Sequence, residues 1–218
     1  NDRLTVGDVM DGHYSYDTGN NSVIGGAGND SIAIWQDGTQ TIDAGDGSDS
    51  VQVGGFSNDY TNGNHNIELG AGDDKLTVWG SSRTQDGVTT INAGSGNDYI
   101  EVQQDHVLKS NLGDGADTLQ IRAEDLNSDD TIVGGNTAGY DTIKLSNASG
   151  DLQTGLVRQS ETTHTTQIEE YWLQDSGIRL DLTDHMFETA QDNSITVNTT
   201  ESTPTPELPD GLVQQYFN

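Results

Sequence analysis

Aspartate recurs at one fixed place in a glycine-rich motif over residues 1–145. The clearest copy reads GGAGNDSIA at residues 25–33, and four similar copies begin at residues 44, 69, 93 and 112. Carboxylate and carbonyl oxygens are the ligands of hard divalent cations, and calcium accepts roughly six to eight of them in a flexible cage. The recurring acid is found at Asp2, Asp30, Asp49, Asp74, Asp98, Asp117 and Asp141.

A pair of glycines, one residue apart, precedes the acid in each of the five clear copies. Glycine adopts positive φ without steric cost, so the backbone can fold back and turn its carbonyl oxygens toward an ion. We therefore expect these glycines to shape the metal site, and the aspartates to supply its negative charge. They are Gly26, Gly28, Gly45, Gly47, Gly70, Gly72, Gly94, Gly96, Gly113 and Gly115.

The motifs recur every 19 to 28 residues, which is the length of one coil in a stacked repeat protein. Stacking brings equivalent acids to about 4.8 Å from one another, and carboxylates that close repel each other unless a cation lies between them. The chain has no cysteine and no clustered histidine, so the donors are all oxygen. The pattern predicts about four to six calcium ions. Four firm sites are expected between the neighbouring acids Asp30, Asp49, Asp74, Asp98 and Asp117.

Each motif runs directly into a short segment with alternating apolar residues, the signature of a β-strand. A second short strand precedes each motif, and loops of variable length separate the two. One unit cannot bury its apolar face alone, whereas stacked units form a continuous thin core. The sequence therefore predicts an all-β fold, a right-handed parallel β-solenoid with two strands per coil. The expected inward residues of the first strand are Leu4/Val6, Ile32/Ile34, Val51/Val53, Leu76/Val78, Ile100/Val102, Leu119/Ile121 and Ile143/Leu145.

The composition sets limits on the partners. The 218 residues include 36 acidic and 8 basic side chains, a formal net charge of −28, and only 30% are hydrophobic. Such acidic, glycine-rich chains usually stay disordered, so the repeated strand pattern requires something to neutralise the acids. Nucleic acids and anionic membranes are disfavoured because phosphates need clustered Lys and Arg. No apolar run has membrane-spanning length. Without an initiator Met or a leader, we expect a piece of a longer protein.

The motif resembles the nonapeptide G-G-x-G-x-D-x-U-x of the RTX (haemolysin-type) calcium-binding repeat family. Residues 25–33 match it at every specified position, and four other copies lack only the first glycine. The resemblance implies a calcium-loaded β-roll in a secreted bacterial protein that folds on calcium binding after export. Family arrays place a motif roughly every nine residues, at both edges of each coil. The longer spacing here implies a divergent member with metal along one edge only.

The same residues invite other interpretations. A dinucleotide or P-loop reading of GGAGND fails because no Gly-Lys-Ser/Thr and no helix follow it. A plain turn repeat without metal leaves the fixed Asp unexplained. The isolated histidines are expected at the surface rather than in a metal site. They are His13, His65, His106, His164 and His185.

Trp35 and Trp79 follow equivalent strands, and either pack against the variable loops or form a platform for sugars. No Ser/His/Asp set or paired carboxylates stand apart from the repeat, so we expect no active site. A lyase or epimerase site would need a basic group beside bound calcium, and the repeat columns supply none.

The repeat pattern stops after residue 145. Residues 146–197 are expected to form capping strands, within TGLVRQS, TTQIEEYWLQ and GIRLDLTDH, that cover the last coil. Tyr171, Trp172 and Leu173 would supply the core of this cap. Residues 198–218 contain all three prolines and are expected to be a linker or tail, the alternative being an extended arm packed on the domain.

The sequence thus predicts a calcium-binding structural module of a secreted or surface bacterial protein. Its role would be to support export, adhesion or the presentation of neighbouring domains. The alternative is a carbohydrate-binding module of an extracellular polysaccharide-active enzyme, which would use the two tryptophans and the variable loops. Calcium is the expected cofactor, and a glycan or neighbouring domains are the further expected partners.

Overall fold

The structure is a computed structural model of the whole chain. It describes residues 1–6, 19–35, 38–54, 63–79, 87–103, 107–135, 139–146, 156–157, 164–174, 178–180, 186, 190 and 194–199. The tail at 200–218, most of the loops between paired strands, the insertion near Thr137, and His13, His106 and His185 lie outside these residues.

Two parallel sheets form the body of the molecule, and every described strand pair within them is parallel. The nine-stranded sheet consists of β1 (Arg3–Val6), β3 (Ser31–Ile34), β5 (Ser50–Val53), β7 (Lys75–Trp79), β9 (Tyr99–Gln103), β11 (Thr118–Arg122), β13 (Thr142–Ser146), β16 (Glu170–Leu173) and β18 (Thr196–Thr199). The seven-stranded sheet consists of β2 (Asn21–Ala27), β4 (Gln40–Asp46), β6 (His65–Ala71), β8 (Val88–Ser95), β10 (Val107–Asn111), β12 (Thr131–Val133) and β15 (Thr165–Thr166).

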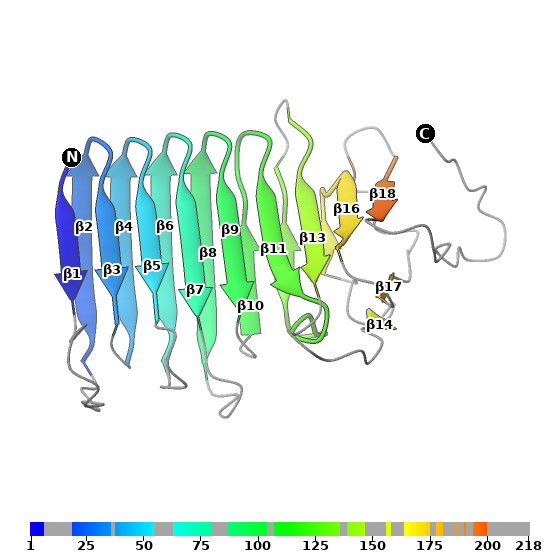
Figure 1. Cartoon of the computed structure of the whole chain (residues 1–218), viewed down its shortest axis with the longest axis horizontal. Coiled ribbons are helices and arrows are strands. Elements are labelled where there is room, and N and C mark those ends of the chain that lie inside the picture. Colours follow the sequence, from blue (N-terminus) through cyan, green and yellow to red (C-terminus); the bar gives the residue numbers. More distant parts are fainter. Residues whose placement is uncertain are drawn as a thin grey trace, which may run out of the picture.

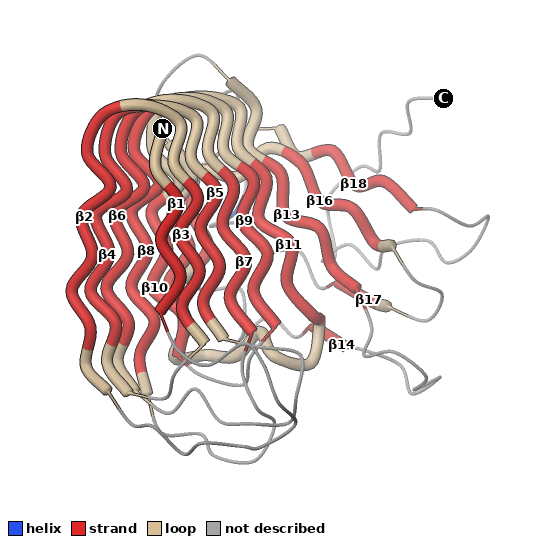
Figure 2. Tube along the Cα trace, turned by 60° about the vertical axis from the view of Figure 1, so that its left-hand side comes forward, coloured by secondary structure: helices blue, strands red, loops and turns tan. Residues whose placement is uncertain are grey.

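From β1 to β13 the chain alternates between the two sheets, so each coil contributes one strand to each. Figure 1 shows the strands side by side along the long axis of the molecule, with the glycine-rich turns along one edge. The same stacking is visible from the N-terminal end in Figure 2, where successive turns superpose. The predicted parallel β-solenoid with two strands per coil is confirmed. The register pairs equivalent motif positions, such as Ile32 with Val51 and Val51 with Leu76.

The core is the narrow space between the sheets, filled by columns of equivalent side chains. The inward residues predicted for β3 to β13 are all buried, and strand alternation explains why, since every second side chain points to the same face. One column of the facing sheet contains Val23, Ile42, Ile67, Ile91, Ser110 and Ile132. Its one polar member is Ser110, whose hydroxyl has no hydrogen-bond partner among the described residues.

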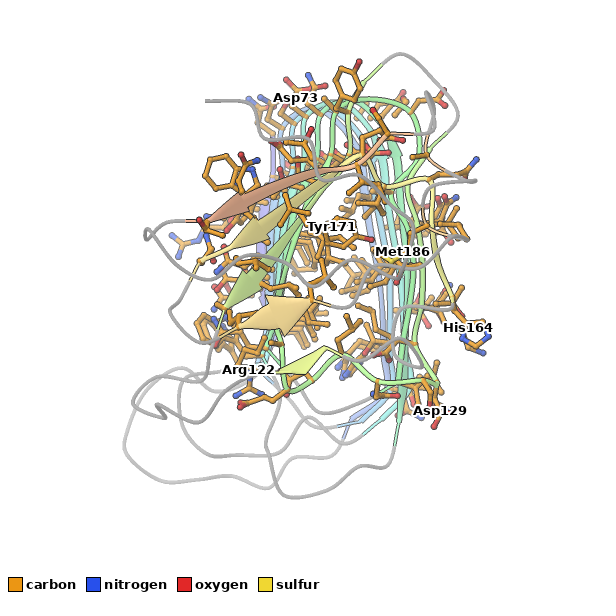
Figure 3. All side chains as sticks on the ribbon, turned by 90° about the vertical axis from the view of Figure 1, so that its right-hand side faces the viewer. Asp73, Arg122, Asp129, His164, Tyr171 and Met186 are labelled. Atoms are coloured by element: carbon orange, nitrogen blue, oxygen red, sulfur yellow. The ribbon has the colours of Figure 1, made fainter. Side chains whose placement is uncertain are left out.

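The two sheets continue beyond the last motif. β15 pairs with β12, and β16 pairs with β13 in register, so the segment TTQIEEYWLQ forms a further coil. Tyr171 and Leu173 are buried, and Figure 3, which looks along the stack, places Tyr171 between the sheets. Trp172 was expected in the same core, and this is corrected: it is only half-buried, because it lies between two inward residues on a strand. A separate two-stranded sheet joins β14 (Leu156–Val157) and β17 (Arg179–Leu180).

Within the described residues, no helix has the length and apolar character needed to cross a membrane.

Candidate functional site: the aspartate column

Glycine-rich turns join the two sheets at one edge, and their backbones stack closely from coil to coil. Gly45 has φ +106°, and a Cβ there would overlap the carbonyl oxygen of Gly26 in the preceding coil. Both the positive φ and the close approach require glycine at this place. All ten glycines of the predicted site have positive φ and lie in these turns.

The aligned aspartates from Asp30 to Asp141 form a continuous buried column just behind the turns. In each coil, the backbone N–H of the aspartate donates a hydrogen bond to Oδ1 of the aspartate in the next coil. The carboxylate therefore satisfies an amide that the turn removes from the sheet ladder. The bonds run from Asp30 to Asp49 (2.7 Å), Asp49 to Asp74 (2.7 Å), Asp74 to Asp98 (2.9 Å), Asp98 to Asp117 (2.8 Å) and Asp117 to Asp141 (3.0 Å). Asp2 makes the same contact with Asp30 at the N-terminal end.

The second carboxylate oxygen has no such role in five consecutive coils. Oδ2 is buried and has no hydrogen-bond partner among the described residues at Asp30, Asp49, Asp74, Asp98 and Asp117. A buried polar atom without a partner is costly, and a buried charge without compensation is more so. These five oxygens are the feature of the column that hydrogen bonding within the described residues leaves unexplained.

Burial raises the pKa of the central acids. The pKa of Asp98 is raised to about 7 by desolvation; the hydrogen bond from the Asp74 amide lowers it, and the carboxylates of Asp117 and Asp74 raise it further. Desolvation also raises the pKa of Asp74 and of Asp117 to about 6 each. The column thus resists holding its full negative charge unless something compensates it.

The column ends differently at its C-terminal side. Both oxygens of Asp141 accept hydrogen bonds, Oδ1 from the Asp117 amide and Oδ2 from the Gly135 amide at 2.8 Å. The Asp141 amide in turn donates to Oε2 of Glu169 at 2.9 Å. Glu169 is buried and occupies the next position of the column, so a glutamate follows the seven aspartates.

Sequence reasoning missed Glu169 because its coil lacks the motif. Only residues 167–169 separate β15 from β16, and the glycine pair is absent. Gln167 takes φ +59° there, the only positive φ of a non-glycine residue in the described ranges. The strand itself was predicted within TTQIEEYWLQ, and the one signal for the site was the acid Glu169 directly before the strand residues EYWL.

A second ladder runs along the exposed side of the column, one residue earlier in each motif. Asn29 Oδ1 accepts from the Ser48 amide at 3.0 Å, and Asp73 Oδ1 accepts from the Asn97 amide at 2.8 Å. Asn97 Oδ1 likewise accepts from the Ala116 amide at 2.9 Å. These exposed contacts fix the turn backbone, and Figure 3 shows Asp73 at the outer end of the turn edge.

The atoms around the column that could bind a cation are all oxygens, which are the ligands that hard cations prefer. At Gly25, a Cβ would overlap the Ala44 carbonyl oxygen and lie 3.1 Å from Oδ2 of Asp30, so glycine leaves an oxygen-lined space there. The equivalent positions of the middle coils carry the apolar residues Ala44, Leu69, Ala93 and Leu112. No point in the described residues is surrounded by three or more His, Cys, Asp or Glu side chains suited to a metal. A cation here would take two carboxylates from neighbouring coils and complete its shell with carbonyl oxygens or water.

Other predicted residues lie away from the column. The histidines were expected at the surface: His164 is exposed, but the expectation is wrong for His65, which is buried at the end of β6 opposite the column. Trp35 and Trp79 occupy equivalent positions after the inward residues Ile34 and Val78, with Gly54 between them in register. Most of the variable loops of the glycan-binding alternative, including 55–62 and 80–86, fall outside the described residues.

Comparison with known proteins returned no matching family model, no matching curated protein and no matching solved structure.

Proposed function

We propose that this chain is a calcium-binding structural module of a secreted or surface bacterial protein, a divergent relative of the RTX repeats. It would fold when calcium compensates the aspartate column outside the cell. The proposal rests on five consecutive buried carboxylates that each have one oxygen without a partner among the described residues.

The charge of the column favours a cation over an internal partner. The chain has 36 acidic and 8 basic side chains, and the salt bridges found among the described residues bring no Lys or Arg to the column. Raised pKa values express the same imbalance, since desolvation penalises the ionised form. A divalent cation shared by two coils would restore the ionised form and join the coils.

Calcium fits this role better than magnesium. The unpartnered oxygens are contributed one per coil, and the remaining ligands would be backbone carbonyls or water in an irregular shell. Calcium tolerates such shells, whereas magnesium requires a tight octahedron and keeps its own water. Asp30, Asp49, Asp74, Asp98 and Asp117 would hold the ions. Extracellular modules bind calcium at about 10⁻⁴–10⁻³ M, which is suited to a protein that orders only after export.

A calcium titration of the whole chain tests the proposal. Circular dichroism in EGTA should show loss of the β-sheet signal, and calcium should restore it cooperatively. Magnesium at the same concentration should restore little. Calorimetric titration of the calcium-free chain should count at least four calcium ions, one between each neighbouring pair of the five acids. A full β-sheet signal in EGTA together with no calcium heat would refute calcium-dependent folding.

A further inference from the structure

All three tryptophans of the chain lie on the outer face of the nine-stranded sheet. Trp79 ends β7, Trp172 lies in β16, and Trp35 directly follows β3. Each is half-buried and adjoins inward core residues, so strand alternation turns it away from the core. Large aromatic side chains on the outer face of a sheet are typical of contact surfaces, although the indole nitrogen of Trp79 is itself buried.

The same face is depleted in negative charge. Over β5 to β16 its outward positions carry three cations, Lys75, Arg122 and Lys144, and two acids, Glu101 and Glu170. The whole chain has the opposite balance, 36 acidic to 8 basic residues. On the other sheet, the outward positions of β4 and β6 carry the acids Asp43 and Glu68. The local charge therefore departs from that of the rest of the molecule.

Two of these cations flank one aromatic ring. The Nζ atoms of Lys75 and Lys144 lie 5.7 Å and 5.9 Å from the ring centroid of Tyr99. The Tyr99 hydroxyl donates to Oε1 of Gln120 at 2.8 Å, which fixes the ring between them. Arg122 differs, because it is paired with Asp125 and Glu124. Neither lysine forms a salt bridge within the described ranges, so both ammonium groups keep their capacity for an anion.

Amide and hydroxyl side chains surround the two lysines. Gln52, Thr77 and Gln120 follow one another across adjacent strands, interrupted by Glu101. These groups repeat at the strand spacing of about 4.8 Å, which suits a ligand that is itself a repeating chain. A peptide partner would instead need deep apolar pockets for its anchor residues, and the outward positions here are polar or aromatic.

We propose that the outer face of the nine-stranded sheet binds an acidic polysaccharide built of uronic acid sugars. Lys75 and Lys144 pair with carboxylates of the polymer, and Trp79 and Trp172 contact the apolar faces of its sugar rings. Gln52, Thr77 and Gln120 hydrogen-bond the hydroxyl groups. This face is separate from the aspartate column, and the proposal does not depend on the identity of the ion there.

The test uses the full chain in calcium and a short oligogalacturonate that does not gel. Calorimetry should detect binding to the parent protein, and the double variant Lys75→Gln/Lys144→Gln should weaken it about tenfold or more, because two charge pairs are lost. The matched control is Lys109→Gln, which removes an exposed lysine from β10 of the other sheet and should leave the affinity unchanged. Circular dichroism checks that all variants fold.

Two comparison ligands complete the experiment. An uncharged glucan oligomer should bind much more weakly than the oligogalacturonate, and so should polyglutamate. Equal binding of polyglutamate would mean that the face takes acidic peptides and would overturn the proposal. Undiminished binding to the Lys75/Lys144 variant would overturn it as well, since bridging calcium at the acidic edge would then hold the sugar. The proposal is also overturned if the parent protein does not bind the oligogalacturonate.

Discussion

The amide nitrogen of Asp74 donates to Oδ1 of Asp98 at 2.9 Å, although the two residues are 24 positions apart in the chain. The two oxygens of each central carboxylate therefore have separate roles. Oδ1 satisfies the amide of the preceding coil, and Oδ2 is left without a partner among the described residues. Substitutions can remove the charge and the acceptor independently.

Asp74→Asn keeps an acceptor for the Asp49 amide and removes the charge. We expect it to raise the calcium midpoint, because a ligand charge is lost, and to leave at least as much β-sheet signal in EGTA as the parent shows, because one buried charge is removed. Asp74→Ala also removes the acceptor, and the buried Asp49 amide then costs about 1–3 kcal/mol of unfolding free energy. Calcium titrations followed by circular dichroism measure the midpoints, and urea unfolding in saturating calcium measures the cost of the lost acceptor.

Asp114→Ala is the matched control for this pair. Asp114 is exposed between the two glycines of its turn, and its loss should change the stability by no more than about 0.5 kcal/mol. If Asp114→Ala raised the calcium midpoint as much as Asp74→Asn, the acids would act as a diffuse cloud of charge rather than through the column.

Without calcium, the folded chain should become less stable as the pH rises from 5 to 8. The pKa of Asp98 is about 7 in the folded chain and that of Asp74 is about 6, both above the usual value. A raised pKa means that the folded state binds protons more tightly than the unfolded state, so stability is lost as the pH passes through the folded pKa. The β-sheet circular dichroism signal of the chain in EGTA, recorded at several pH values from 5 to 8, follows this loss. Saturating calcium should reverse or flatten it, and a chain in EGTA that gained stability up to pH 8 would contradict the expectation.

Glu169 should be replaceable by Gln but not by Asp. Its coil crosses between the sheets in only three residues, and the longer side chain brings its carboxylate to the Asp141 amide. Glu169→Asp should leave that amide unsatisfied and lower the unfolding free energy by about 1–3 kcal/mol. Glu169→Gln keeps the acceptor and should lower it less. The thermal unfolding of the two variants in calcium gives the comparison, and a larger loss for Glu169→Gln than for Glu169→Asp would show that the charge matters and not the reach.

Two glycines of the same turn position should tolerate alanine unequally. Gly26 and Gly45 have similar φ values, +100° and +106°, but a Cβ on Gly26 meets nothing within 4 Å. Gly26→Ala should cost only the backbone strain, about 1–2 kcal/mol. Gly45→Ala adds an overlap with the Gly26 carbonyl and should cost more or prevent folding. Urea midpoints in calcium test this difference, which vanishes if the coils do not stack as described.

The strands, their pairing and the buried columns could be predicted from the sequence because each depends on a local pattern repeated many times. The position of Glu169 could not, because a single turn without glycines carries no repeat signal and only the register with β13 reveals it. Trp172 was expected in the core because a run of three large residues reads as apolar, whereas strand alternation turns the middle one outward. Spacing also placed the aspartates in one column, but the hydrogen bond that occupies Oδ1 depends on side-chain geometry.

The ladder of amide-to-carboxylate bonds has a direction. Every coil from Asp2 to Asp141 receives its acceptor from the coil that follows it in the chain, and Glu169 supplies the last one. An amide of an earlier coil therefore lacks its acceptor until the next coil is in place. Because the ribosome synthesises the N-terminal coils first, they emerge before the coils that supply their acceptors. The coils would therefore fold in the reverse of their order of synthesis, beginning at the coil of Glu169 and ending at the N-terminus.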